Sequence, residues 1–188
     1  MLNTKQIRML QLLDNQIQCC ELCGLFKGGR AKPYWTEESI WAIVGEAPGS
    51  EEVINNSPFV GAAARHLWEV INANGLERKN FLIINSVNCR PTDGSKNLKP
   101  TISTMSLCRP WIRKYLRVFK PQKILLLGGY SLNTILYESG ILRLNATKTH
   151  SSEFGCDVIR SVHPSMCIYH GNNGKKMLYE SIKLFGEI

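Results

Sequence analysis

Residues 40–49 read IWAIVGEAPG, an apolar run that ends in a glycine, a glutamate and a Pro-Gly turn. Three more apolar runs of strand length follow along the chain: FLIINSV (81–87), KILLLGG (123–129) and VIRSV (158–162). Runs that are apolar throughout are typical of parallel strands whose two faces are both covered. The sequence therefore predicts an α/β fold, in which helices cover both faces of a four-stranded parallel sheet.

The segments between these runs carry apolar residues at helical spacing, such as Leu10, Leu13 and Ile17 near the N-terminus. They predict helices over 4–18, 61–74, 103–118, 130–139 and 174–186. Glycine- and proline-containing loops are expected at 24–39 and 91–100. We find no internal repeat or low-complexity linker, and 188 residues fit one domain, so residues 1–188 are expected to form a single domain.

The chain is basic, with 23 Lys and Arg against 15 Asp and Glu, a net charge of +8. This excess favours a polyanionic partner such as nucleic acid, although a solvated basic surface is an equal alternative. No apolar stretch is long enough to span a membrane, and the N-terminus lacks the apolar core of a signal peptide. We therefore expect a cytoplasmic protein (in the host cytoplasm if its source is viral) with no membrane partner.

Seven cysteines in a reducing compartment suggest metal binding more than disulfides. Cys20 and Cys23 form a tight pair, Cys89 follows the second strand, and Cys108 lies in the first turns of a basic helix. Four thiolates from these places suit a zinc ion or a four-iron cluster, and the spacing does not separate the two. Buried free cysteines are the structural alternative. Cys19, Cys156 and Cys167 are expected to be ordinary core or surface residues.

Polar sequence follows three of the four predicted strands: GEAPG, NSVNCRP and HPS. In parallel sheets, ligands bind at the carboxyl ends of the strands. We therefore expect Glu46, Asn85 and His163 to surround one cleft.

Seven motifs together, in this order, resemble those of the iron–sulfur (family 4) uracil-DNA glycosylases. They are CELCGL (20–25), VGEAPGSEE (44–52), SPFVG (57–61), NSVNCRP (85–91), LCRPWI (107–112), KPQKILLLGG (120–129) and SVHPS (161–165). The resemblance spans about residues 20 to 170. It implies a three-layer α/β/α sandwich around a four-stranded parallel sheet. It also implies a structural 4Fe-4S cluster on Cys20, Cys23, Cys89 and Cys108, with zinc as the less favoured occupant.

The resemblance also implies roles for residues around the cleft. Phe59 would stack on an extruded uracil, and Ala47 would offer its backbone to the base. Asn85 would pair with the N3–H and O4 of uracil, since an amide has one acceptor and two donors. His163 would donate to O2 as negative charge develops there. Glu46 would orient or deprotonate the attacking water, or stabilise the cationic sugar. The catalytic residues would thus be Glu46, Asn85 and His163.

Each of these residues also has a structural interpretation. Phe59 could belong to the core, Asn85 could cap the strand end, His163 could end its strand before a proline, and Glu46 could cap a helix. Glu52, a second acidic position of the family, is expected to brace the loop.

DNA contacts are expected from the GAAAR helix start, from the loop after the second strand and from the segment after the HPS motif: Gly61, Arg65, Arg90, Ser165, Tyr169 and His170. This chain departs from the family at Asn56-Ser57, Ala63-Ala64 and Asn88, and it reads MCIYHGNNG (166–174) where the family carries leucines and an arginine that wedge the duplex. Tyr169 or His170 would then take the wedge position, and less efficient action on duplex DNA is expected.

The sequence thus predicts a monofunctional uracil-DNA glycosylase of base-excision repair, which flips uracil out of DNA and hydrolyses the N-glycosidic bond to leave an abasic site. Its partners would be single- or double-stranded DNA containing uracil, and replication or repair proteins, and it would act as a monomer. Two alternatives stay open: a DNA-binding or replication scaffold with this fold that does not excise, and an enzyme acting on another modified pyrimidine.

Overall fold

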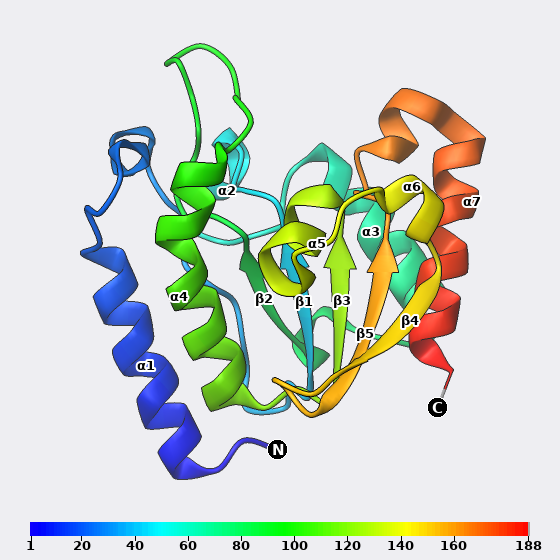
Figure 1. Ribbon diagram of the computed structural model, residues 1–188, viewed down its shortest axis with the longest axis horizontal. Helices are drawn as coiled ribbons and strands as arrows, with labels where there is room; N and C mark the ends of the chain where they lie inside the picture. The colour runs from blue at the N-terminus through cyan, green and yellow to red at the C-terminus, as the bar shows by residue number, and fades with distance from the viewer. Residues whose placement is uncertain (188) are drawn as a thin grey trace.

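The computed structural model describes residues 1–187, which form one five-stranded sheet in the order β2-β1-β3-β5-β4 (Figure 1). The strands are β1 (Trp41–Gly45), β2 (Phe81–Asn85), β3 (Lys123–Leu127), β4 (Thr147–Ser151) and β5 (Cys156–Ser161). Strands β2, β1, β3 and β5 are parallel, which confirms the four predicted strands. The predicted strand count is one too low.

The additional strand β4 pairs antiparallel with β5 at the edge of the sheet. Its sequence, TKTHS, is polar, and only Ser151 at its end is buried. An edge strand with solvated side chains does not need the apolar run that marks a central parallel strand. This is why the search for apolar runs missed it.

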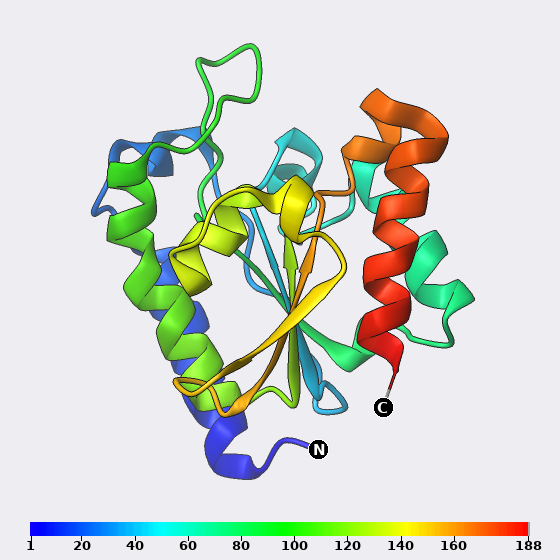
Figure 2. The ribbon, with the colours of Figure 1, turned by 45° about the vertical axis from the view of Figure 1, so that its right-hand side comes forward.

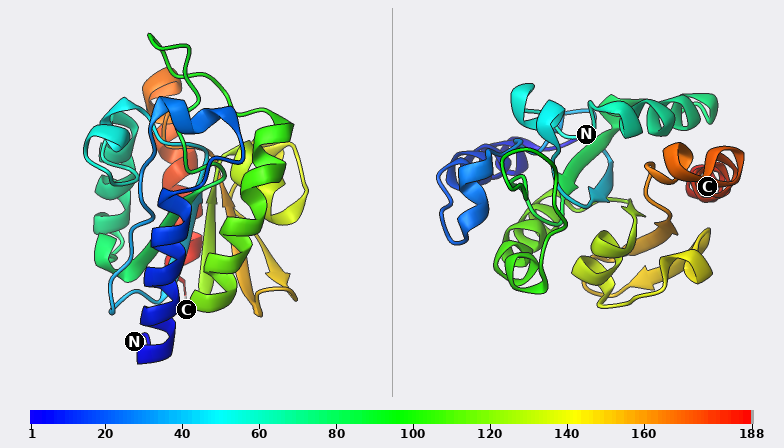
Figure 3. Two further views of the ribbon diagram at one scale, coloured as in Figure 1. Left: turned by 90° about the vertical axis from the view of Figure 1, so that its left-hand side faces the viewer. Right: turned by 90° about the horizontal axis from the view of Figure 1, so that it is seen from above.

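The helices cover both faces of the sheet (Figure 3). Their bounds are α1 (Thr4–Gln18), α2 (Ser50–Ile54), α3 (Ala62–Ala73), α4 (Ile102–Phe119), α5 (Gly129–Leu136), α6 (Ile141–Leu144) and α7 (Met166–Gly186), with short 3-10 turns η1 (Gly24–Gly28) and η2 (Arg78–Asn80). Five of these helices were predicted. The last one begins earlier than expected, and its backbone breaks at Gly171, where φ is 50°.

Side chains of β1 show why the strands are apolar throughout. Ala42 and Val44 pack with α1, α4 and α5 in one core layer, whereas Ile43 packs with α3 and α7 in the other. All three side chains are fully buried. Figure 2 shows α3 and α7 together on one side of the sheet. The fold is therefore the predicted three-layer α/β/α sandwich. No helix within residues 1–187 is long and apolar enough to cross a membrane.

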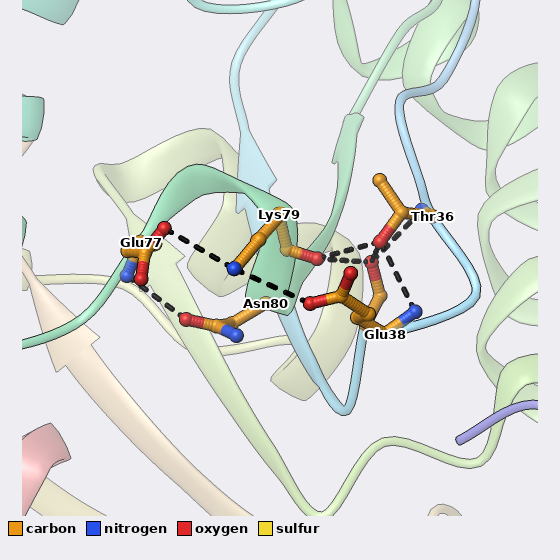
Figure 4. Close-up of polar contacts among 6 residues, drawn as sticks. Thr36, Glu38, Glu77, Lys79 and Asn80 are labelled. Atoms are coloured by element: carbon orange, nitrogen blue, oxygen red, sulfur yellow. Dashed lines mark hydrogen bonds and ion pairs between the residues drawn. The ribbon is translucent and has the colours of Figure 1, made fainter.

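The loops at the amino ends of β1 and β2 are tied together by polar contacts (Figure 4). Thr36 Oγ1 and Ser39 Oγ both donate to the carbonyl oxygen of Lys79, at 2.9 and 2.8 Å. The Lys79 ammonium lies 3.4 Å from Glu38 and 3.5 Å from Glu77. These contacts set the entry of both strands, at the end of the sheet opposite to the predicted cleft.

A buried carboxylate joins α1 to α4. The Asp14 side chain is only 2% exposed and accepts hydrogen bonds from the Tyr115 hydroxyl at 2.8 Å and from Trp35 Nε1 at 3.1 Å. Lys32 lies 3.1 Å from the same carboxylate. Because α1 leads directly to the first predicted cysteine ligands, this contact also fixes where that segment begins.

We predict that Tyr115→Phe lowers the free energy of unfolding by about 1–3 kcal/mol, because it leaves a buried carboxylate short of a donor. Urea unfolding, followed by circular dichroism, would measure the loss. Tyr179→Phe is the matched control, since Tyr179 is about half exposed. Equal stability of the two variants would contradict this role for Asp14 and Tyr115.

Candidate active site

A pocket of about 380 Å³ lies at the carboxyl ends of β1 and β2, and residues that follow β5 also line it. Its lining includes all five residues predicted to contact a base: Glu46, Ala47, Phe59, Asn85 and His163. The loop of residues 91–100 rises above the same end of the sheet (Figure 1). The structure therefore brings the predicted residues together around one cleft.

Gly45 permits the closest packing in this pocket. It is the last residue of β1 and pairs in register with Asn85, the last residue of β2. A Cβ atom on Gly45 would overlap Asn85 Oδ1 and lie 2.5 Å from Phe59 Cζ. Only glycine at this position lets the Asn85 amide and the Phe59 ring approach the strand end so closely.

The Asn85 side chain is only 4% exposed and lines the pocket, and no hydrogen bond joins it to another residue in 1–187. Its amide atoms are not among the fully buried polar atoms that lack a partner, so they face the pocket. Its donors and acceptor are therefore free for a ligand in the pocket. Capping of the strand end, the structural alternative, is not what this side chain does.

The Phe59 ring forms the side of the pocket that faces His163. The two ring centroids are 6.3 Å apart and their planes are tilted by 36°. Phe59 has a φ of 54°, in the left-handed region that residues with a Cβ seldom adopt. Its side chain is buried among core residues, so it serves the core and also borders the pocket.

Hydrogen bonds fix the tautomer of His163. Its Nδ1 atom accepts the backbone N–H of Ser165 at 3.2 Å and lies 2.9 Å from Ser165 Oγ. A backbone N–H can only donate, so Nδ1 carries no proton and the neutral ring is protonated at Nε2. Burial, assisted by the positive charge of Lys99, lowers the pKa of His163 to about 4. At neutral pH the ring is a neutral donor.

Glu46 lies in the pocket and is paired with a lysine that sequence reasoning did not single out. Lys99 Nζ is 3.1 Å from Glu46 Oε1, and the lysine side chain is 72% exposed. Asn97 and Leu98, its neighbours in the 91–100 loop, also line the pocket. Nothing in the local sequence marks this loop as part of the site, because only the chain's path over the strand ends places it there.

Glu52 braces the loop, as predicted. Its carboxylate accepts the backbone N–H groups of Gly49 at 3.0 Å, Val60 at 3.0 Å and Gly61 at 2.8 Å. These three bonds link the turn after β1 to the segment that carries Phe59.

The residues predicted to contact DNA fall into two groups. Gly61, Ser165 and the largely exposed Tyr169 line the pocket. Arg65, Arg90 and His170 lie outside the pocket lining, and Arg65 and His170 are exposed. Arg90 donates from Nε to Asn97 Oδ1 at 2.6 Å, and this hydrogen bond holds the base of the 91–100 loop. Ala64, one of the departures from the family pattern, is buried beside the pocket.

Four cysteines come together near the end of α1. Cys89 and Cys108 are buried, Cys20 and Cys23 are half-buried, and all are free thiols. Burial raises the pKa of Cys89 to about 11 and that of Cys108 to about 12, and in both cases the nearby thiols of Cys20 and Cys23 add to the rise. Within residues 1–187, no three His, Cys, Asp or Glu side chains are grouped closely enough to hold a single metal ion.

Arg30 places a positive charge beside these thiols. Its guanidinium donates to the carbonyl oxygens of Ile17 at 3.0 Å, of Gln18, and of Cys20 at 3.1 Å. Its charge opposes the effect of burial on the pKa of Cys89. Arg30 thus closes the end of α1 and offsets negative charge where thiolates would gather.

Comparison with known proteins shows which family this chain resembles. The family model described as the uracil DNA glycosylase superfamily matches residues 33–184. The type-4 uracil-DNA glycosylase of Archaeoglobus fulgidus is 30% identical, over 92% of this chain and 89% of that protein. The protein of the same name from Sulfurisphaera tokodaii is 28% identical, over 95% of this chain and 84% of its own length.

A third protein of that name, from Pyrobaculum aerophilum, is 35% identical over 68% of this chain and 64% of its own length. The family model covers the sheet from β1 to β5 and every pocket residue described above. The chain therefore belongs to the uracil DNA glycosylase superfamily.

Proposed function

We propose that the protein is a monofunctional uracil-DNA glycosylase of base-excision repair. The observation that carries this proposal is the buried Asn85 amide, which has no partner among the described residues and lies against Phe59 in a pocket with His163. A donor and an acceptor side by side suit the N3–H and O4 edge of uracil. Stacking of the base on the Phe59 ring would contribute about 1–3 kcal/mol to its binding.

His163 would stabilise the leaving uracil. As the bond between C1′ of the sugar and N1 of the base breaks, the bonding electrons move to the base and negative charge grows on O2. The Nε2–H of a neutral His163 would donate to that oxygen, and the bond from Ser165 to Nδ1 holds the ring in the required tautomer.

Glu46 would act on the sugar side of the same bond. Its carboxylate could accept a proton from the attacking water as the water oxygen bonds to C1′, or it could stabilise the positive charge on the sugar. The ion pair with Lys99 holds the carboxylate at the pocket in the free protein. Water addition and loss of uracil leave an abasic site, and no redox step is needed.

DNA would be bound by the rim of the pocket. The net charge of +8 favours a polyanion. Gly61, Ser165 and Tyr169 border the pocket where the flanking phosphates would pass, while Arg65, Arg90 and His170 would contact the strand further out. We propose action on uracil in single- or double-stranded DNA by a monomeric, single-domain protein in the cytoplasm, alongside replication or repair proteins.

We also propose that Cys20, Cys23, Cys89 and Cys108 hold a structural 4Fe-4S cluster. Four sulfur donors with an arginine beside them match the chemistry of such a cluster. Zinc, which binds four thiolates at about 2.3 Å, is the less favoured occupant. The cluster would crosslink the end of α1, the loop after β2 and the start of α4.

One observation favours a second candidate, a DNA-binding scaffold that does not excise. Lys99 pairs with Glu46 and so occupies the carboxylate that would act on water. Intact DNA binding without abasic product would support that candidate.

We predict that Asn85→Ala and His163→Ala each lower the rate of uracil excision by about 100- to 1000-fold, the usual cost of removing one donor to a developing anion. Alkaline cleavage of a labelled oligonucleotide with one uracil would measure the abasic product. His150→Ala is the control, since His150 is exposed on β4 and lies outside the pocket. No cleavage by the folded wild-type protein on either single- or double-stranded DNA would overturn the proposed function.

We predict that His163 stays neutral and protonated at Nε2 down to about pH 4, because burial lowers its pKa. An unfolded histidine titrates near pH 6.5. The unfolded chain therefore binds the additional proton between those values, and the contribution of His163 to stability falls as pH falls from about 6.5 to about 4. Nitrogen NMR of the imidazole, assigned with His163→Gln, would test this, and a titration midpoint near 6.5 would contradict it.

We predict about four iron atoms per chain in protein purified without oxygen. Cys89→Ala should lose the iron and its visible absorbance, while Cys156→Ala, a buried cysteine outside the group, should keep both. Metal analysis would decide the matter. One zinc per chain, or full iron content in Cys89→Ala, would contradict the assignment.

A further inference from the structure

The segment that carries Phe59 has an unusual backbone. Phe59 and Asn56 both have positive φ values, 54° and 45°, although neither is a glycine. Such conformations persist where surrounding contacts enforce them, and they gather at functional sites. The contacts that hold this segment therefore determine where the Phe59 ring points.

Arg78, in η2, makes three of these contacts. Its Nη2 donates to Pro58 O at 2.7 Å and to Ser57 Oγ at 3.1 Å, and its Nη1 donates to Phe59 O at 3.2 Å. One side chain thus binds three consecutive residues of the segment. The planar, forked guanidinium suits this task, whereas a lysine ammonium could not reach all three acceptors in one plane.

Two aromatic rings fix the guanidinium in place. Its central carbon lies 4.4 Å from the centroid of Tyr34 and 4.9 Å from that of Trp68. Trp68 Nε1 also donates to Phe59 O, at 2.9 Å. Burial lowers the pKa of Arg78, and the neighbouring Tyr34 and Glu52 oppose that effect. The cation is therefore held by stacking as well as by hydrogen bonds.

The same segment is held from its other side by an anion. Glu52 accepts the N–H groups of Val60 and Gly61, which directly follow Phe59. A cation thus binds the carbonyl side of the segment and a carboxylate binds its amide side.

We propose that Arg78 is a positioning residue for base recognition, which holds Phe59 so that its ring can stack on the extruded base. This inference rests on the proposed function. Arg78 is not among the residues that line the pocket, so it acts through Phe59.

The turn that contains Arg78 does not depend on its side chain. The backbone of η2 is held by the Asn80 side chain, which accepts the N–H of Glu77 at 2.9 Å, and by Thr36 and Ser39 on the carbonyl of Lys79 (Figure 4). Loss of the guanidinium should therefore release Ser57–Phe59 and leave the start of β2 intact.

A double-mutant cycle separates positioning from general stability. Arg78→Met should lower kcat/KM for a uracil oligonucleotide about tenfold, mainly through a higher KM, since stacking acts on the bound base. In a Phe59→Ala background the same change should lower kcat/KM less than about twofold, because no ring is left to position. An equally large effect in both backgrounds would overturn the proposal.

Two further variants serve as controls. Arg78→Lys keeps the charge but loses the fork, so it should recover only part of the lost kcat/KM. Arg160→Met removes an arginine that is buried, binds Glu138 at 2.8 and 2.9 Å and lies outside the pocket. It should lower stability but leave KM unchanged, and a raised KM in this variant would count against the proposal.

A measurement without catalysis keeps this test apart from the proposed function. Fluorine-labelled phenylalanine, with the Phe59 signal assigned by Phe59→Leu, should give a Phe59 line that shifts or broadens in Arg78→Met but not in Arg160→Met. An unchanged line in folded Arg78→Met would overturn the positioning role even if uracil is excised. A changed line in a protein that excises no uracil would support the positioning of the ring and refute only the proposed activity.

Discussion

The close approach of Phe59 and Asn85 over Gly45 is the contact on which the pocket depends. It exists because β1 and β2 are parallel and in register, so that Gly45 and Asn85 end their strands side by side. A side chain at Gly45 would force the ring and the amide apart. The register in turn rests on apolar side chains that fill both faces of the sheet, and on the polar contacts that tie the strand entries together.

Charged and polar groups then hold the loops that surround this contact. Arg78 and Glu52 bind opposite sides of the Ser57–Gly61 segment, and Ser165 fixes the tautomer of His163. At the neighbouring edge, Arg30 and the cysteines join the end of α1 to the loop after β2. Hydrogen bonds to backbone groups thus hold the residues around the pocket in place. This suits a site that must be ready before an extruded base arrives.

Much of this arrangement was predictable. The parallel strands β1, β2, β3 and β5 carry continuous apolar runs, and Glu46, Asn85 and His163 follow strand ends in motif order, so their meeting at one cleft could be expected. The grouping of Cys20, Cys23, Cys89 and Cys108 was expected from their spacing, and the resemblance to a family added the 4Fe-4S cluster, which stays a prediction. The edge strand β4 was missed because its side chains are polar. Lys99 and Arg78 were missed because each acts at a distance along the chain from its partner.

The sequence by itself determined the order of the four parallel strands and the five longest helices, and the residues at the strand ends, because apolar periodicity and short motifs are local properties. Only the tertiary structure decided which nitrogen of His163 carries the proton, and that the Asn85 amide has no hydrogen-bond partner among the described residues. It also decided that Lys99 pairs with Glu46 and that Arg78 binds the carbonyl of Phe59. These depend on which groups meet across the fold, because hydrogen bonds and close ion pairs form only when their atoms lie about 3 Å apart.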